Sequence, residues 1–246
     1  MKGLIIALQF LTRIPLKINL NITEKEFGSC TKFFPLVGLV IGLILMAIYS
    51  LTYNLLPEIA VGAIILISQI ILTGGIHLDG FMDTMDGLLS ARPQEVMLEI
   101  MKDSRVGAHS VTALFCLLIL KFSLLISLPR EIAPYLLLIM PGIGYWVMVF
   151  CLAFFPYARP KGLGKIFHQE TKKKYWYLST FFMGLLFLLF FPPIYLLIPL
   201  ISFLIILSPA LLINKALGGH TGDTYGAINE LAQVIFLLVS LLIFNI

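Results

Sequence analysis

Charged residues are scarce in this chain of 246 residues. Only 12% of the residues are Asp, Glu, Lys or Arg, whereas 59% are hydrophobic, and the mean hydropathy is +1.00. A soluble domain has about 25% charged residues, so this composition excludes an ordinary soluble protein. Apolar stretches of about 20 residues, the length that a helix needs to cross a bilayer, recur along nearly the whole sequence. We therefore expect residues 1–246 to form a single membrane-embedded domain.

The sequence also lacks a cysteine framework and a typical leader cleavage site after its first apolar segment. Cys30, Cys116 and Cys151 are widely separated, so they form neither a metal-binding spacing nor a disulfide pattern. The apolar segment 1–11 is followed by Thr-Arg-Ile-Pro at 12–15 instead of a small-residue cleavage site. We therefore predict that this segment is retained. No internal repeat is visible, which disfavours a transporter built from inverted repeats.

The apolar stretches predict an all-α, polytopic helical bundle with about seven transmembrane helices. Short connectors that contain proline, at 56–58, 129–131 and 191–193, indicate tight turns between neighbouring spans. Gly38 and Gly42 lie one helical turn apart in the first span, a spacing that allows close helix packing. The expected spans are 33–56, 59–76, 107–128, 132–155, 175–191, 194–213 and 227–245.

The basic residues predict the orientation of the bundle, because cytoplasmic loops carry an excess of Lys and Arg. Fifteen of the 17 basic residues, Lys17 among them, lie in the N-terminal segment and in the three loops on the same side. Only Arg130 falls clearly on the other side, and Lys121 lies within a span. We expect a cytoplasmic amino terminus and an external carboxyl terminus in the cell membrane.

Three aspartates follow the second predicted span at helical spacing. Asp79, Asp83 and Asp86 would share one face of a helix that continues from this span. Like charges at the membrane repel one another and are costly to desolvate. A bound cation would relieve that repulsion, and carboxylate ligands favour Mg²⁺, Mn²⁺ or Ca²⁺ over zinc. We predict a metal site here; the alternative is a solvated helix face at the membrane boundary.

A segment of mixed charge comes next, before the third span. Arg92, Lys102 and Arg105 supply the donors that bind phosphate groups. Each of these basic residues is equally explained by the ordinary charge bias of a cytoplasmic loop. Asp103 is a candidate catalytic base or further metal ligand. Next to an acidic metal site, the segment predicts a phosphorylated substrate.

Two histidines flank the same segment. His77 is a candidate proton shuttle, and His109 is a candidate substrate contact, because imidazole titrates near neutral pH. The alternative is that each histidine is an interfacial polar residue with satisfied hydrogen bonds.

The last predicted cytoplasmic loop is rich in glycine. Glycines let backbone amides approach an anion, whereas the alternative is a helix-breaking turn. The loop is not a Walker motif, because no Gly-Lys-Ser/Thr follows the glycines. Asp223 is a candidate catalytic base, ribose contact or metal ligand. The candidate substrate-binding residues in this loop are Gly219, His220, Thr221 and Gly222.

Taken together, these motifs resemble one family. The run HLDGFMDTMDGLLSAR at 77–92, LEIMKDSRVGAH at 98–109 and GGHTGDTYGA at 218–227 look like cobalamin synthase, the adenosylcobinamide-GDP ribazoletransferases. FLTRIP at 10–15 and FFPLVG at 33–38 resemble the opening of the same family. The resemblance covers nearly the full chain, with the motifs in the same order.

The resemblance implies a Mg²⁺-dependent late step of coenzyme B12 assembly. In that step α-ribazole or its 5′-phosphate attacks adenosylcobinamide-GDP, the corrinoid phosphate is transferred, and GMP leaves. The products are adenosylcobalamin or its 5′-phosphate. The partners implied are these small molecules, the lipid bilayer and other B12-assembly enzymes; no nucleic-acid polymer is expected.

Two other functions are weighed against this one. Asp83, Asp86 and Gly87 resemble the start of the CDP-alcohol phosphotransferase signature, but Ala91-Arg92 comes one residue late and the second acidic half is missing. A cation transporter would carry charges at mid-membrane, whereas the span centres are nearly free of charge apart from Lys121.

Overall fold

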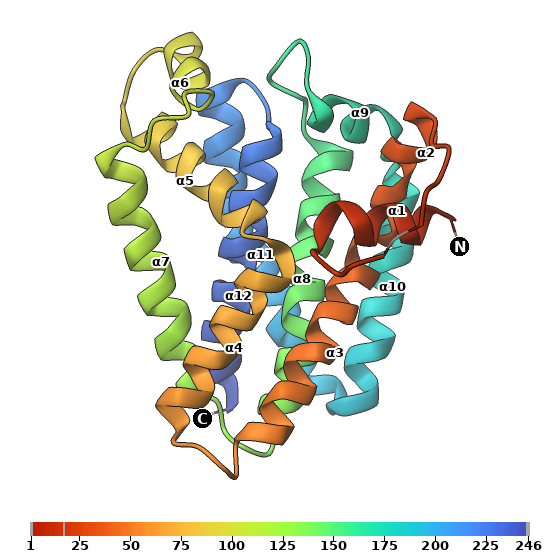
Figure 1. Ribbon diagram of the computed structural model, residues 1–246, viewed down its shortest axis with the longest axis vertical. Helices are drawn as coiled ribbons and strands as arrows, with labels where there is room; N and C mark the ends of the chain where they lie inside the picture. The colour runs from red at the N-terminus through yellow and green to blue at the C-terminus, as the bar shows by residue number, and fades with distance from the viewer. Residues whose placement is uncertain (1, 17, 245–246) are drawn as a thin grey trace.

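The protein, seen in a computed structural model that describes residues 2–16 and 18–244, is built from helices (Figure 1). These residues contain no β-strand, and their isolated β-bridge joins Tyr157 to His220. Lys17 and Asn245, the end of the last expected span, lie outside the described residues. The α-helices are α1 (Lys2–Leu11), α2 (Glu24–Gly28), α3 (Phe34–Thr52), α4 (Glu58–Thr73), α5 (Ile76–Leu89), α6 (Gln94–Ile100), α7 (Ala108–Ile126), α8 (Ala133–Phe154), α9 (Leu163–Glu170), α10 (Lys173–Phe190), α11 (Leu197–Leu217) and α12 (Gly222–Phe244).

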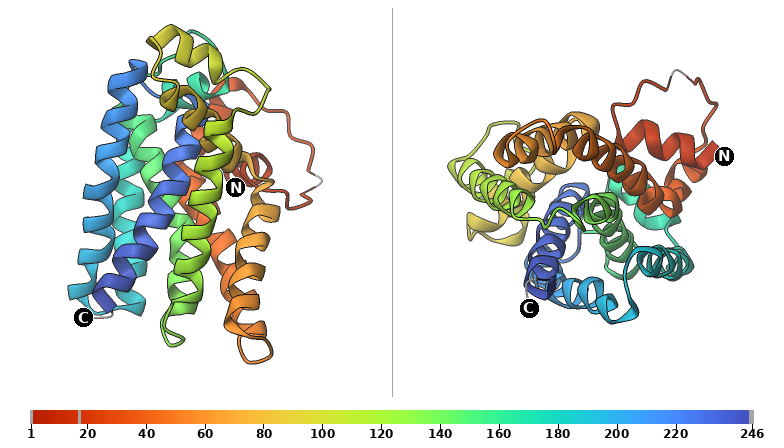
Figure 2. Two further views of the ribbon diagram at one scale, coloured as in Figure 1. Left: turned by 90° about the vertical axis from the view of Figure 1, so that its left-hand side faces the viewer. Right: turned by 90° about the horizontal axis from the view of Figure 1, so that it is seen from below.

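The long helices run side by side, and the short helices α2, α6 and α9 gather at one end of the bundle (Figures 1 and 2). The turns that join α3 to α4 and α7 to α8 lie at the opposite end, near the C-terminus. The expected all-α membrane bundle with short hairpin connections is therefore confirmed. The end that carries the short helices also holds the segments in which the candidate site residues lie.

The number of spans differs from the expected seven. Five helical segments of the described chain are long and apolar enough to cross a membrane, and a bent pair of helices makes a sixth. The expected span at 59–76 is part of this bent pair, α4 and α5. The expected span at 175–191 is helix α10, which is not among the six because its first turns carry Lys173, Lys174 and three aromatic residues. All seven segments are helical, but a count of seven is not confirmed.

Helix α8 lies at the centre of the bundle and is almost entirely buried. Helix α3 packs closely along it through the two glycines that the sequence singled out. A Cβ atom on Gly38 would lie 2.7 Å from the Cα of Gly142, and one on Gly42 would overlap the carbonyl oxygen of Leu138. Any larger residue at these two positions would push the helices apart.

A sharp bend between α4 and α5 places the aspartates. Gly74 and Gly75 have φ values of 65° and 71°, a left-handed conformation that glycine adopts without steric cost. The two helices meet at 90°. The expectation that the aspartate helix simply continues the second span is therefore wrong. The bend directs α5 along α12 toward the end that carries the short helices (Figure 1).

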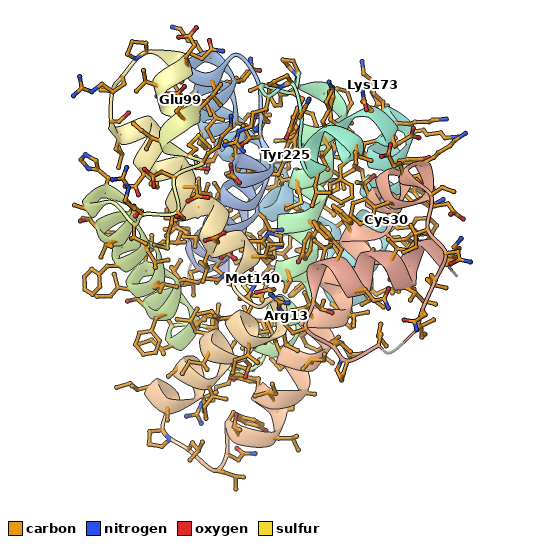
Figure 3. All side chains as sticks on the ribbon, turned by 45° about the horizontal axis from the view of Figure 1, so that its top comes forward. Arg13, Cys30, Glu99, Met140, Lys173 and Tyr225 are labelled. Carbon is orange, nitrogen blue, oxygen red and sulfur yellow. The ribbon has the colours of Figure 1, made fainter. Side chains whose placement is uncertain are left out.

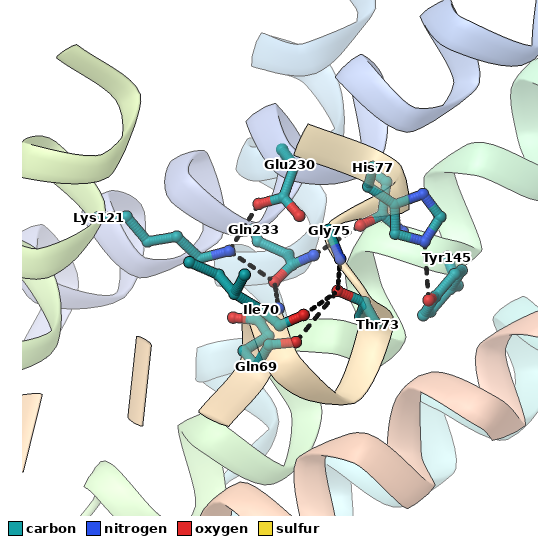
Figure 4. Close-up of polar contacts among 10 residues, drawn as sticks. Gln69, Ile70, Thr73, Gly75, His77, Lys121, Tyr145, Glu230 and Gln233 are labelled. Carbon is teal, nitrogen blue, oxygen red and sulfur yellow. Dashed lines mark hydrogen bonds and ion pairs between the residues drawn. The ribbon is translucent and has the colours of Figure 1, made fainter. Parts of the chain in front are cut away.

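A buried polar network joins α4, α7 and α12 inside the bundle (Figure 4). Lys121 of α7 donates hydrogen bonds to Glu230 at 2.7 Å and to Gln233 at 3.1 Å, both on α12. Gln69 of α4 donates to the same Gln233 oxygen. The Lys121 and Glu230 side chains are only 2% and 5% exposed. Lys121 and Glu230, the two charged residues within the predicted spans, are thus paired with each other, as buried charges must be.

We expect Lys121→Met to destabilise the protein by about 3–5 kcal/mol, because it leaves the Glu230 carboxylate buried without its partner. Arg130→Met is the matched control, since Arg130 pairs with Glu58 at an exposed site, where a salt bridge contributes little to stability. Unfolding in detergent, followed by circular dichroism, measures both changes. Equal losses of stability in the two variants would contradict the structural role assigned to the buried Lys121–Glu230 pair.

Candidate active site

A cavity of about 320 Å³ opens between α1, α3, α5, α8, α9, α12 and the segment 157–164. Its charged lining residues are Asp79, Arg159, Lys161 and Asp223. Tyr225 of α12, which also lines it, lies at the end of the bundle that carries Glu99 of α6 and Lys173 of α10 (Figure 3). Acidic and basic groups from three separate segments thus meet in one concave site, the usual form of a small-molecule site.

Asp223 lies in the first turn of α12, at the centre of these charges. Its carboxylate accepts a hydrogen bond from Thr221 at 3.3 Å and pairs with Arg159 at 2.8 Å. Gly80 lets α5 approach this turn, because a Cβ atom there would lie 2.7 Å from the Asp223 carbonyl oxygen. The close contact brings Asp79 and Asp83 of α5 within electrostatic reach of Asp223. The N-terminus of α12 adds the partial positive charge that favours bound anions.

Arg159 is the site residue that the sequence reasoning missed. One Nη atom pairs with Asp223, whereas its Nε and second Nη atoms are buried without a hydrogen-bond partner. Buried guanidinium donors that lack a partner are costly unless a ligand satisfies them. In the sequence Arg159 is one of six basic residues in a loop read as an orientation signal, so no local pattern distinguishes it.

The glycine-rich loop is hydrogen-bonded to the backbone that precedes Arg159. His220 exchanges backbone hydrogen bonds with the preceding segment, from its N–H to the Pro156 oxygen and from the Ala158 N–H to its own oxygen, each at 2.8 Å. Gly219, with φ of 151°, is needed for this close approach, since a Cβ atom there would lie 2.6 Å from the Pro156 oxygen. The loop therefore fixes the backbone immediately before Arg159.

The predicted substrate-binding residues of this loop have different surroundings. His220 is fully buried, and its ring nitrogens contact the Thr224 hydroxyl and the Ala210 carbonyl oxygen. Burial lowers the pKa of His220 to about 4, so the ring is neutral at physiological pH. Thr221 is buried and accepts a hydrogen bond from the Thr224 N–H at the start of α12. Gly222 lines the cavity, so of this group it is the residue that a ligand there would meet.

The three aspartates of α5 diverge. Asp79 lines the cavity, and Asp83, one turn on, is half-buried within electrostatic reach of Asp79 and Asp223. Asp86 instead accepts hydrogen bonds from the backbone N–H groups of Gly107 and Ser110, at 2.8 and 2.9 Å. Asp86 thus caps the N-terminus of α7, a structural role that the spacing did not indicate.

Within residues 2–16 and 18–244, no three His, Cys, Asp or Glu side chains lie close enough to form a ready-made metal centre. The donors that line or adjoin the cavity, Asp79, Asp83 and Asp223, are all carboxylates. Mg²⁺ is usually held by one or two carboxylates together with water and substrate phosphates, not by a complete protein cage. The donor set fits Mg²⁺ of that kind, and metal binding by Asp79, Asp83 and Asp86 stays a prediction.

The mixed-charge segment lies outside the cavity lining. Arg92, Lys102, Arg105 and His109 are exposed. Arg105 donates hydrogen bonds to Asp103, which lower the pKa of this carboxyl group to about 2. A carboxyl group with so low a pKa is a poor proton acceptor at neutral pH. The phosphate-binding and catalytic roles predicted for this segment stay predictions, and the cavity offers Arg159 and Asp223 for the same tasks.

His77 lines the cavity, and its role as a proton shuttle stays a prediction. Its ring is buried, and its Nε2 atom lies 2.8 Å from the hydroxyl of Tyr145 on α8 (Figure 4). Gly226 permits the backbone of α12 to pass directly beside it. His77 therefore has a fixed orientation at the junction of α5, α8 and α12.

Comparisons with known proteins show the family of the chain. The model of the cobalamin-5-phosphate synthase family matches residues 3–241, nearly the entire chain. The chain belongs to this family. It is 43% identical to the adenosylcobinamide-GDP ribazoletransferase of Desulfitobacterium hafniense, over 97% of this chain and 96% of that protein. It is 34% identical to the protein of the same name from Fusobacterium nucleatum, over 99% and 98% of the two chains. No solved structure matches the chain.

The match to the cobalamin-5-phosphate synthase family extends over every segment that lines the cavity, from α1 to α12. The matched range includes the loop that carries Arg159 and the segment of α5 that carries the aspartates. The resemblance read from the sequence motifs is confirmed at the level of the family.

Proposed function

We propose that this protein is an adenosylcobinamide-GDP ribazoletransferase, which transfers the corrinoid phosphate to α-ribazole or its 5′-phosphate. The observation that carries the proposal is the meeting of Asp79, Arg159 and Asp223 in one cavity of a chain that matches relatives of this name along its full length. Carboxylates beside a buried arginine and a helix N-terminus suit a diphosphate substrate.

The chain's own residues supply the main parts of the reaction. A ribose hydroxyl group of ribazole attacks the corrinoid-side phosphorus of adenosylcobinamide-GDP, and the bond from that phosphorus to the bridging oxygen breaks, so GMP leaves with that oxygen. Asp223 accepts the proton of the attacking hydroxyl group. The buried Nε and Nη donors of Arg159 bind the phosphate oxygens, and the N-terminus of α12 adds backbone amides.

Asp79 and Asp83 are proposed to hold Mg²⁺ together with oxygens of the diphosphate. When bound, the ion would neutralise negative charge that develops on the phosphates and on the departing GMP. The crowding of carboxylates between α5 and α12 supports this role, because without a cation they repel one another.

The site is proposed to face the cytoplasm, in the cell membrane. In the sequence, 15 of the 17 basic residues fall in the N-terminal segment and in the three loops predicted for the cytoplasmic side, as the charge rule for cytoplasmic loops predicts. Water-soluble GDP-linked substrates are then available directly from the cytoplasm.

The test uses purified protein in liposomes, given adenosylcobinamide-GDP, α-ribazole and Mg²⁺. We expect release of GMP and formation of a cobalamin in equal amounts, and loss of both after chelation of the metal. Omission of ribazole is the control, because hydrolysis alone would release GMP without cobalamin. Absence of both products, or release of CMP from a CDP-alcohol instead, would overturn the proposal.

A further inference from the structure

Part of the cavity lining is aromatic and apolar. Phe10 of α1, Phe34 of α3 and Phe167 of α9 line it, and Met148 and Leu152 of α8 extend the same apolar part. The ring centroids of Phe10 and Phe167 lie 4.9 Å apart, and those of Phe34 and Phe167 lie 5.6 Å apart. None of these five side chains carries a strong hydrogen-bonding group.

The charged part of the same cavity is formed by Asp79, Arg159, Lys161 and Asp223. The Arg159–Asp223 ion pair holds two of these groups together. A ligand that fills the whole cavity therefore needs an apolar, flat end and a polar or anionic end. A nucleoside with an apolar base has this form.

We infer that the cavity binds the acceptor nucleoside, with its heterocyclic base in the apolar part and its ribose at the charged part. The inference rests on the proposed function and adds the location of one substrate. It places the attacking ribose hydroxyl group beside Asp223, the proposed proton acceptor. It also assigns Phe10, Phe34 and Phe167 as residues that select the base.

The chemistry of the lining favours ribazole over the guanine of the donor. Ribazole carries a benzimidazole ring with two methyl groups, which gains from burial against aromatic side chains. Guanine presents an amide and an amino group, and the apolar part offers them no partners, so its burial there would leave these groups unsatisfied. A cavity of about 320 Å³ holds a drug-sized ligand such as a nucleoside but not a corrinoid.

The first experiment varies the acceptor and leaves the protein unchanged. Purified wild-type protein in liposomes is given α-ribazole, its analogue without the two methyl groups, or an analogue with a purine base. We expect kcat/KM to fall about tenfold without the methyl groups, because each buried methyl contributes to binding, and to fall further with the purine. Equal kcat/KM values for the three acceptors would overturn the inference.

The second experiment changes the cavity with Phe167→Leu. We expect the KM for α-ribazole to rise about tenfold and the preference for the methylated base to shrink, while the KM for adenosylcobinamide-GDP stays unchanged. Phe181→Leu is the matched control, because Phe181 is 65% exposed on α10 and lies outside the cavity. A higher KM for the GDP substrate alone would place guanine here and overturn the inference.

A direct measurement of α-ribazole binding tests this inference independently of the proposed function. Equilibrium dialysis of radiolabelled α-ribazole measures occupancy without turnover, for the wild type, Phe167→Leu and Phe181→Leu. Weaker binding to Phe167→Leu alone supports the subsite even if the wild type releases no GMP, a result that would defeat only the proposed function. Equal binding of α-ribazole to all three proteins, or binding that disappears when lipid is added back, would overturn the proposed nucleoside subsite. Release of GMP by the wild type would still support the proposed function.

Discussion

Asp79→Asn is expected to lower the kcat for GMP release by about 10³-fold while leaving the bundle folded. The carboxylate lines the cavity and is proposed to hold Mg²⁺ against the diphosphate. Loss of a metal ligand removes several kcal/mol of transition-state stabilisation, and each 1.36 kcal/mol corresponds to a factor of ten in rate. Asparagine keeps the size of the side chain and removes only its charge. The measurement is single-turnover GMP release in liposomes at several Mg²⁺ concentrations.

Asp103→Asn is the matched control for Asp79→Asn. It makes the same carboxylate-to-amide change at a residue that pairs with Arg105 outside the cavity, so we expect activity within about twofold of the wild type. A folded Asp79→Asn protein that keeps wild-type activity would contradict the assignment of Asp79. An equal loss of activity in the Asp103 variant would indicate that the active site includes the mixed-charge segment that follows α6.

Arg159→Met is expected to reduce kcat/KM for adenosylcobinamide-GDP by about 10²-fold. The change removes the buried donors proposed to bind phosphate, and charge-assisted hydrogen bonds contribute about 1.5–3 kcal/mol each. It also leaves Asp223 without its 2.8 Å ion pair. Arg159→Lys should recover only part of the activity, because lysine keeps the charge but not the forked donor geometry. Steady-state kinetics with the GDP substrate varied at saturating α-ribazole measures these effects.

The control for Arg159→Met is Arg105→Met, which removes an exposed guanidinium paired with Asp103. We expect its kcat/KM to stay close to that of the wild type. If Arg105→Met were the impaired variant and Arg159→Met were active, the phosphate would bind where the sequence motifs alone suggested. The two variants therefore compare the site predicted from sequence with the site formed by the fold.

The fold was predictable from the sequence because its signals are local. Apolar length marked each long helix, and the proline connectors marked the hairpin turns. The bend at Gly74 and Gly75 was not predicted, although two adjacent glycines are a visible signal for a left-handed helix end. The aspartate pattern was correctly assigned to a helix, but the direction of that helix depends on two backbone dihedral angles.

The site was less predictable because it depends on contacts between distant segments. Asp86 seemed equivalent to Asp79 in the sequence, yet it caps a helix that begins about twenty residues later. Arg159 reaches Asp223 across 64 positions in the chain, and nothing in its own loop distinguishes it from neighbouring lysines. The partnership of Lys121 with Glu230 is likewise invisible without the packing of α7 against α12.

The central claim is that the cavity between α5 and α12 is the site of phosphoryl transfer. A crystal structure of the protein with Mn²⁺ and adenosylcobinamide-GDP, with anomalous data, tests it most directly. We predict an anomalous peak in contact with the Asp79 carboxylate and diphosphate oxygens within hydrogen-bond distance of Arg159. Metal and diphosphate bound instead beside Asp103 and Arg105, with the cavity free of both, would contradict the account.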